Sequence, residues 1–135
     1  MTPQEIFDTV AKHLFTQGRQ SSDNIGGCLY RGPCGTKCAV GILIPDAAYH
    51  EDMEGCSVKG LFDPEACKLD EFSLPAWMAE HVNLLQRLQN VHDQVDYWAD
   101  DKRMRWELSL VAQAFGLDDS VLPGLSFNRP EGQNA

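Results

Sequence analysis

A single cysteine is the first candidate for chemistry in this chain. Cys38 follows a turn rich in glycine and proline at 32–37 and opens an apolar run that is stopped by a proline, so the sequence predicts a short helix beginning at Cys38. A thiol at a helix N-terminus has a lowered pKa and can act as a nucleophile, with His81, or His92 beside Asp93, as its base. The alternative is that Cys38 is a small buried apolar residue that lets its segment pack closely.

The same turn is a candidate site for a small anionic ligand such as a nucleotide. Backbone N–H groups of Gly35, Thr36, Lys37 and Cys38 could hold a phosphate, with Arg31 and Lys37 as counter-charges. The spacing differs from that of a P-loop, and glycine and proline explain the turn without any ligand. Ligand binding and a purely structural turn therefore both stay open.

The cysteines also raise the question of a metal. Cys28, Cys34 and Cys38 could form a thiolate site with His50 or Cys56. Their spacings, C-x5-C and C-x3-C, lack the tight pair with which a structural zinc site usually begins, and no C-x-x-C pair occurs in the chain. We therefore expect no metal and no cofactor, and we expect the five cysteines to be reduced thiols.

The third group of chemically informative residues is acidic. The chain of 135 residues has 11 Lys and Arg against 20 Asp and Glu, a net charge of −9. Residues 46–71 hold eight carboxylates against two lysines, a net −6. Such a chain is repelled by nucleic-acid backbones and anionic membranes, so we expect neither as a direct partner. The carboxylates predict an exposed interaction surface for a protein with a basic face, made of Asp46, Glu51, Asp52, Glu54, Asp63 and Glu65.

The elements that must position these residues are mainly helices. Thr2, Pro3 and Glu5 form an N-cap, a first helical position and a capping box, which predict a helix to about Gln17 that ends at Gly18. Its apolar residues recur every three to four positions. Cys28 to Arg31 alternates as a short strand does, and the glycine-rich acidic middle predicts only turns and short helices.

The second half predicts two longer helices. From Pro75 to about Val95 an apolar stripe recurs at helical spacing, made of Trp77, His81, Leu84, Leu85, Leu88, Val91 and Val95. A second helix should begin after Asp96 or Asp100 and end at Gly116. Its buried face is predicted to contain Met104, Leu108, Val111 and Phe115, widened by Trp106 and Leu110.

The fold predicted from these patterns is a mainly α, small single domain. It has an N-terminal helix, a short strand-turn-helix insertion, an irregular acidic middle and a C-terminal antiparallel helix pair. The domain should span residues 1–123, followed by a flexible C-terminal tail at 124–135. The N-terminus lacks the pattern of a secretory leader, and no apolar run is long enough for a membrane span, so we expect a cytoplasmic protein.

One stretch of the sequence resembles a known family. The string YRGPCGTKCAVGILIPD at 30–46, with LQNVHD at 88–93, a Trp at 98 and AFGL at 114–117, is similar to small uncharacterised proteins encoded by phages and prophages. The resemblance implies a phage-related protein acting in a bacterial cytosol and attaches no activity to any residue.

These observations together predict a non-enzymatic interaction protein. It would bind a host or defence protein through its acidic surface and block nucleic-acid binding, as an anti-defence inhibitor does. One alternative is a protein that sequesters a small anionic ligand at 32–37, and a further one is a cysteine-dependent enzyme using Cys38.

Overall fold

The computed structural model describes residues 1–23, 27–63, 65 and 73–129. Over these residues the protein is mainly α, as predicted, and contains no strand. The strand expected at Cys28–Arg31 is wrong. The chain makes only two isolated antiparallel bridges in this region, Ser22 with Cys28 and Arg31 with Lys37.

The first helix follows the local signals in the sequence. α1 spans Pro3–Gln17; the Thr2 side chain accepts from the Glu5 N–H at 3.1 Å, and the Glu5 carboxylate accepts from the Thr2 N–H at 2.9 Å. Gly18 ends the helix with a left-handed backbone, φ 71°. The predicted capping box and terminator are both confirmed.

The long helix predicted for residues 75–95 is instead two helices. α4 spans Ala76–Glu80 and α5 spans Val82–Asp93, and His81 between them has φ −123° and ψ 27°, outside helical geometry. The chain then forms the 3₁₀ helix η6 (Val95–Ala99), which leaves Val95 68% exposed. Apolar spacing runs across the break at His81, so periodicity alone could not reveal it.

The last long helix has the predicted ends and a narrower buried face. α6 spans Asp101–Phe115, with Asp100 as its N-cap and Gly116 as its left-handed C-cap. Met104, Leu108 and Val111 are buried, but Trp106 is 60% exposed. Because each residue turns an α-helix by about 100°, Trp106 lies about 200° from Met104 and Leu108 and faces away from them.

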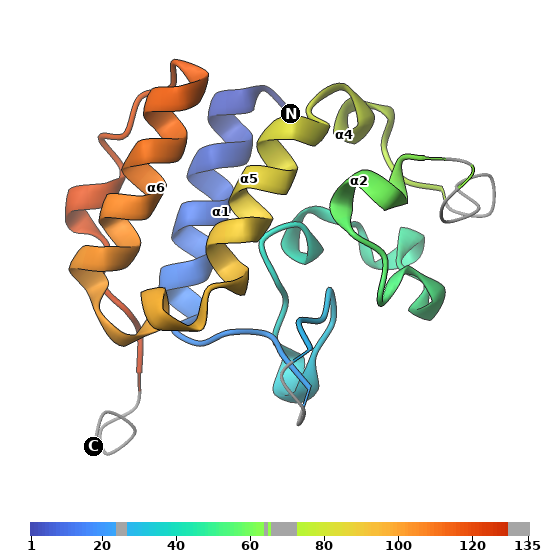
Figure 1. Cartoon of the computed structure of the whole chain (residues 1–135), viewed down its shortest axis with the longest axis horizontal. Helices are drawn as coiled ribbons and strands as arrows, with labels where there is room; N and C mark the ends of the chain where they lie inside the picture. The colour runs from blue at the N-terminus through green and yellow to red at the C-terminus, as the bar shows by residue number, and fades with distance from the viewer. Residues whose placement is uncertain (24–26, 64, 66–72, 130–135) are drawn as a thin grey trace.

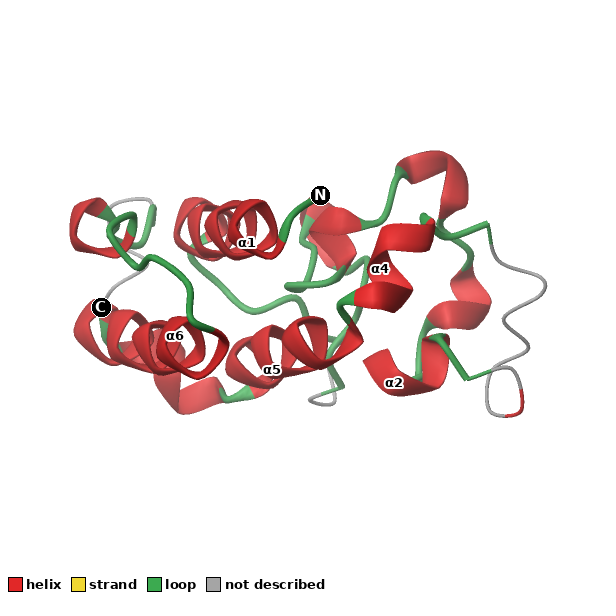
Figure 2. Ribbon diagram, turned by 90° about the horizontal axis from the view of Figure 1, so that it is seen from above, coloured by secondary structure: helices red, strands yellow, loops and turns green. Residues whose placement is uncertain are grey.

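Three helices build the regular part of the molecule. α5 packs against both α1 and α6, and α6 runs antiparallel to α5 (Figure 1). Viewed from above, α1 lies in one layer over the pair formed by α5 and α6 (Figure 2). Six of the predicted core residues are buried: Ile6, Val10, Leu84, Leu88, Met104 and Leu108. The other two, Trp77 of α4 and Phe115 of α6, are half-buried.

The middle of the chain forms short elements beside this helical layer. The 3₁₀ helices η1 (Pro33–Gly35), η2 (Gly41–Leu43), η3 (Asp46–Ala48) and η4 (Glu51–Met53) lead to the four-residue helix α2 (Val58–Leu61), which packs on α5. The helix predicted to begin at Cys38 is therefore wrong, because Cys38 has no regular structure and is followed by a turn at 39–40 before η2. Cys38 and Val40 are fully buried, as expected.

The C-terminal segment at 125–129 is not a free tail. After the 3₁₀ helix η7 (Leu122–Gly124), Phe127 stacks between Phe15 and Trp98, with ring centroids 4.9 and 5.5 Å away. The Asn128 N–H donates to the Phe15 carbonyl at 2.8 Å. The predicted flexible tail at 124–135 is thus wrong for 125–129, and residues 130–135 lie outside the described part of the chain.

No helix in the described ranges combines the length and apolar character needed to cross a bilayer.

Candidate functional site

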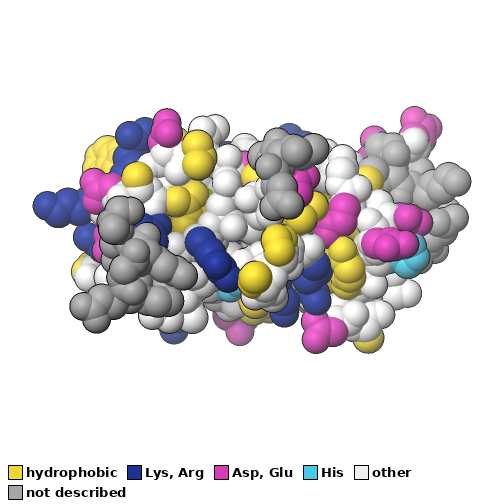
Figure 3. Space-filling view, turned by 90° about the horizontal axis from the view of Figure 1, so that it is seen from below, with side chains coloured by type: hydrophobic (Ala, Val, Ile, Leu, Met, Phe, Trp, Pro, Cys, Tyr) yellow, Lys and Arg dark blue, Asp and Glu magenta, His cyan; other side chains and the backbone are white. Residues whose placement is uncertain are grey.

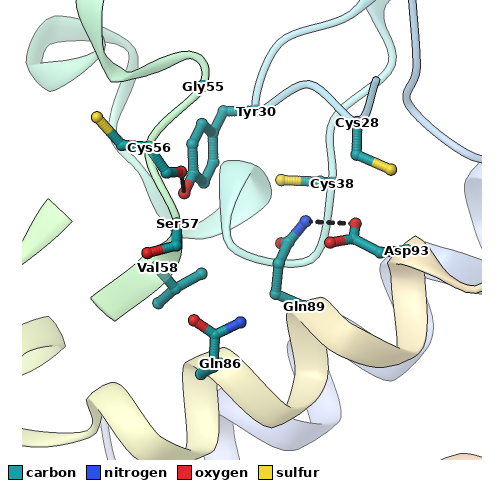
Figure 4. Close-up of a pocket in the computed structure, with 10 residues that line it drawn as sticks. All are labelled: Cys28, Tyr30, Cys38, Gly55, Cys56, Ser57, Val58, Gln86, Gln89 and Asp93. Carbon is teal, nitrogen blue, oxygen red and sulfur yellow. Dashed lines mark hydrogen bonds between the residues drawn. The ribbon is translucent and has the colours of Figure 1, made fainter. Parts of the chain in front are cut away.

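A cavity of about 500 Å³ lies between α5 and two irregular segments of the chain (Figure 4). Gln86, Gln89 and Asp93 reach it from α5, since residues spaced three and four apart share one helix face. Residues 28–38 supply two thiols and an aromatic ring, and residues 55–58 close the remaining side. Segments far apart in the sequence therefore meet at this cavity.

The Asp93 carboxylate at the cavity is held by hydrogen bonds. Its Oδ1 accepts from Gln89 Nε2 at 2.9 Å and from His92 Nδ1 at 2.8 Å. Gln89 is itself fixed, because its Oε1 accepts from the Val40 N–H at 3.1 Å. The Asp93 side chain remains 39% exposed, so it is both positioned and accessible.

His92 connects the cavity to the helical layer. The ring is fully buried, and its Nε2 accepts from the Ser21 N–H at 3.0 Å. In the neutral ring the proton must then sit on Nδ1, which donates to Asp93. The His92 carbonyl accepts from Trp98 Nε1 at 2.8 Å and from Gln20 Nε2 at 3.0 Å. His92 is therefore a structural hub with a defined tautomer.

The tautomer of His92 bears on whether Cys28, His92 and Asp93 could bind a metal ion. Cys28, His92 and Asp93 offer a thiol, an imidazole and a carboxylate with ligand atoms all within 4.8 Å of one another. A metal needs an unprotonated ring nitrogen, but Nε2 already accepts from Ser21 and Nδ1 carries the proton. His92 thus has no lone pair to give, and two ligands remain, fewer than the three protein ligands of a typical zinc site.

Neither thiol at the cavity is activated. Burial, reinforced by the nearby Asp93 carboxylate, raises the pKa of Cys28 to about 12. Burial also raises the pKa of Cys38 to about 12, against weaker lowering by hydrogen bonds from Gly41 and Val40. Both groups are neutral thiols at physiological pH. With no helix N-terminus at Cys38, the geometry does not support a cysteine nucleophile.

The remaining thiols do not assemble into the zinc site considered from the sequence. Cys34 is exposed, with φ 59°, and does not line the cavity that Cys28 and Cys38 share. Cys56 does line it but is disulfide-bonded. The expectation that all five cysteines are reduced is therefore wrong at Cys56.

Two N–H groups of the turn at 32–37 already have hydrogen-bond partners within the protein. The Gly32 N–H donates to the Thr36 carbonyl at 2.8 Å, and the Lys37 N–H donates to Gln17 Oε1 at 2.8 Å. Thr36 is buried, Gly35 is exposed, and the fully buried Cys38 presents no surface to a ligand.

The two cations of that turn share one counter-charge. Arg31 lies 2.7 Å and Lys37 3.9 Å from Asp46 Oδ1. The hydrogen bond from Arg31, aided by Lys37, holds the pKa of Asp46 below its ordinary value. An anion would have to displace Asp46, so the structure gives the anion-site hypothesis no support.

One predicted surface carboxylate proves to be structural. Glu54 is half-buried and accepts from the Tyr30 N–H at 2.8 Å, the Arg31 N–H at 3.1 Å and the Tyr49 hydroxyl at 2.6 Å. The expectation that Glu54 is exposed is wrong. Burial and the neighbouring Glu54 raise the pKa of Tyr49 to about 12. Glu54 thereby fastens η4 to the segment at 30–31.

The other acidic residues do form a surface. Glu51, Asp52, Asp63 and Glu65 are exposed, and we call these four residues the acidic end. At one end of the molecule in Figure 3, acidic side chains lie with no Lys or Arg among them, whereas acidic and basic side chains are mixed over the middle and the opposite end. Asp46 is also exposed, but Arg31 neutralises it.

Sequence reasoning grouped Cys28 with Cys38 as possible metal ligands, and Cys38 with His92 and Asp93 as a possible nucleophile and base, but it missed that Cys28, Cys38 and Asp93 share a cavity. It also missed Gln86 and Gln89, although both lie with Asp93 on one face of the predicted helix. The available signal was the spacing of Gln86, Gln89 and Asp93, which places three polar side chains on one face of the helix.

Comparison with protein-family models, curated proteins and solved structures matches no family, relative or known fold to this chain. The function is therefore argued from the geometry.

Proposed function

We propose that the protein acts by binding another protein through its acidic end. The observation that supports this most is the exposure of all four carboxylates of the acidic end, at one end of an elongated molecule (Figures 1 and 3). A partner with a basic face would gain complementary charge and faster association there. Neither the neutral thiols nor the turn at 32–37 offers an equally supported alternative.

The specific version of this proposal concerns nucleic-acid-binding proteins. A basic face that recognises phosphates is complementary in charge to a protein of net charge −9. The protein would occupy that face on a host or defence protein in a bacterial cytosol and exclude DNA or RNA. The resemblance to phage-encoded sequences motivates this setting.

Affinity purification at two salt concentrations tests the proposal. Glu51→Lys with Asp52→Lys should abolish capture of a partner that the unchanged protein retains at low salt and loses at high salt. The matched control is Asp96→Lys with Asp119→Lys, which makes the same four-unit charge change at exposed residues outside the acidic end. The control should keep the partner.

The mode of action is tested with the captured partner. DNA or RNA should compete with the protein for that partner, and its binding should weaken as salt rises. A partner retained by the Glu51→Lys, Asp52→Lys variant at high salt would contradict the proposal, because the carboxylates would then not form the interface.

A further inference from the structure

The cavity beside α5 is not part of the acidic end, and it has an unusual charge. Among the ten residues that line it, Asp93 carries the formal charge, and no Lys, Arg or His is present. Cys28 and Cys38 add no charge, since burial keeps both thiols protonated. The formal charge of the cavity lining is therefore negative.

Asp93 is held in a defined orientation at the edge of the cavity. The hydrogen bonds described for its carboxylate, from Gln89 and from His92, both reach Oδ1. Neither donor is a cation when His92 is the neutral tautomer that Ser21 selects. A carboxylate beside a partly enclosed space favours a cation that enters that space, because the space screens charge less than bulk water does.

The opposite wall suits the same kind of ligand. Tyr30 is 5% exposed, and its hydroxyl donates to the Cys56 carbonyl at 2.6 Å, which fixes the ring. The ring and Asp93 lie on different sides of the cavity (Figure 4). A cation in the cavity would have a carboxylate on one side and an aromatic ring on the other. The volume of about 500 Å³ leaves room for an attached alkyl chain.

We propose that this cavity binds a guanidinium or primary ammonium group, paired with the carboxylate of Asp93 and packed against the ring of Tyr30. A basic side chain of a protein and a free small amine present the same chemistry. The inference deepens the proposed function, because a partner with a basic surface would supply such side chains. The idea that the group comes from a partner protein therefore rests on the proposed function. Binding of the group itself is measured without the partner.

The test titrates the full chain with two probes of similar shape, one cationic and one neutral. N-acetyl-arginine amide carries a guanidinium, and N-acetyl-citrulline amide carries a neutral group of the same shape. Amide chemical shifts in ¹⁵N-labelled protein should move saturably at Tyr30, Gln89 and Asp93 with the arginine probe. The citrulline probe should bind at least about tenfold more weakly.

Two substitutions locate the counter-charge. Asp93→Asn keeps an Oδ1 acceptor for Gln89 and His92 and should weaken the arginine probe about tenfold or more. Asp96→Asn removes the same charge from an exposed residue outside the cavity and should leave binding unchanged. If Asp93→Asn fails to fold, Cys28→Lys decides, because a lysine ammonium beside Asp93 should abolish probe binding.

Several results would overturn the inference. One is that the arginine probe shows no saturable binding, and another is that both probes bind equally. A third is that the Asp93→Asn or Cys28→Lys variant binds the arginine probe as tightly as the unchanged protein does. Displacement of the probe by Zn²⁺ would assign the cavity to a metal instead. A putrescine titration separates the sources, since tighter binding of putrescine indicates a free amine and tighter binding of the arginine probe indicates a side chain.

The inference and the proposed function fail separately. The Glu51→Lys, Asp52→Lys variant should still bind the arginine probe, because Asp93 and Tyr30 are unchanged. Capture that persists in the Glu51→Lys, Asp52→Lys variant, with the probe still bound, would reject the acidic end alone. Capture that persists in Asp93→Asn, with no probe bound to the unchanged protein, would reject the cavity alone.

Discussion

Cys28 and Cys38 line the same cavity, and both thiols are unreactive because they are buried. Both thiols are taken out of water, and Asp93 disfavours negative charge on Cys28 in particular. Cys34 is exposed and does not share this environment. The environment of each thiol, rather than the residue type, therefore decides its reactivity.

We predict that iodoacetamide modifies Cys34 much faster than Cys28 or Cys38 in the folded protein. A thiol whose pKa is about 12 is ionised in roughly one molecule in ten thousand at pH 8. Peptide mass spectrometry after timed alkylation measures each rate. In urea, the control, Cys28 and Cys38 should react at rates similar to that of Cys34.

The same thiols make stability depend on pH. Folding raises the pKa of Cys28 and Cys38 from 9.0 to about 12, so the folded state holds these protons more tightly than the unfolded state. The free energy of unfolding should therefore be unaffected by them below about pH 9 and fall as the pH rises from 9 toward 12. Alkylation of Cys38 as fast as that of Cys34 at pH 8 would contradict this account.

At the scale of elements, the C-terminal segment fastens separate parts of the helical layer. Phe127 stacks on Phe15 of α1 and on Trp98 of η6. Arg129 donates to the Gly18 carbonyl at 2.8 Å and also to the Trp98 carbonyl. The segment thus connects the end of α1 to the turn that joins α5 to α6.

We predict that Phe127→Ala lowers the free energy of unfolding by about 1–3 kcal/mol, less than for a fully buried phenylalanine because the ring is half-buried. Urea denaturation followed by circular dichroism measures the loss. Ser126→Ala is the control, since Ser126 is exposed, and it should change stability by less than about 0.5 kcal/mol. Equal effects of the two substitutions would mean that 125–129 behaves as a free tail.

The helices show which elements local sequence can predict. Thr2, Gly18, Asp100 and Gly116 act within one turn of their own helix, so the ends of α1 and α6 follow from the sequence. The packing of Phe127 depends on residues more than 25 positions away, and no local pattern encodes it. His81 shows a related limit, because apolar spacing continues through the break between α4 and α5.

The candidate site was less predictable than the fold, because it depends on contacts between residues far apart in the sequence. Gly41 illustrates this, because an added Cβ would overlap the Tyr30 carbonyl, so the two segments meet only where a side chain is absent. The sequence indicated a small residue there but not its neighbour. Contacts between segments 28–38, 55–58 and α5 create the cavity, and none of these contacts has a periodic signature.

At the scale of the whole molecule, repulsion between carboxylates outweighs the attractive ion pairs. The net charge is −9, whereas the Lys and Arg ion pairs of the described residues involve only Asp46 and Glu107. Unlike these two, the exposed Glu51 and Asp52 have no Lys or Arg partner among the described ion pairs. Self-repulsion in the folded state should therefore lower stability when salt is scarce.

We predict that the melting temperature rises by a few degrees between about 10 and 200 mM NaCl, because the Debye length falls from roughly 30 to below 10 Å and screens this repulsion. Replacing Glu51 with Gln and Asp52 with Asn should raise the melting temperature at low salt and reduce the salt effect. Asp96→Asn with Asp119→Asn is the matched control, with the same change in net charge outside the acidic end. Scanning calorimetry measures both. If both double substitutions raise the melting temperature equally, the repulsion is spread over the surface. A melting temperature that falls with salt would mean that attractive ion pairs dominate. The acidic end would then carry no excess charge for a basic partner to neutralise.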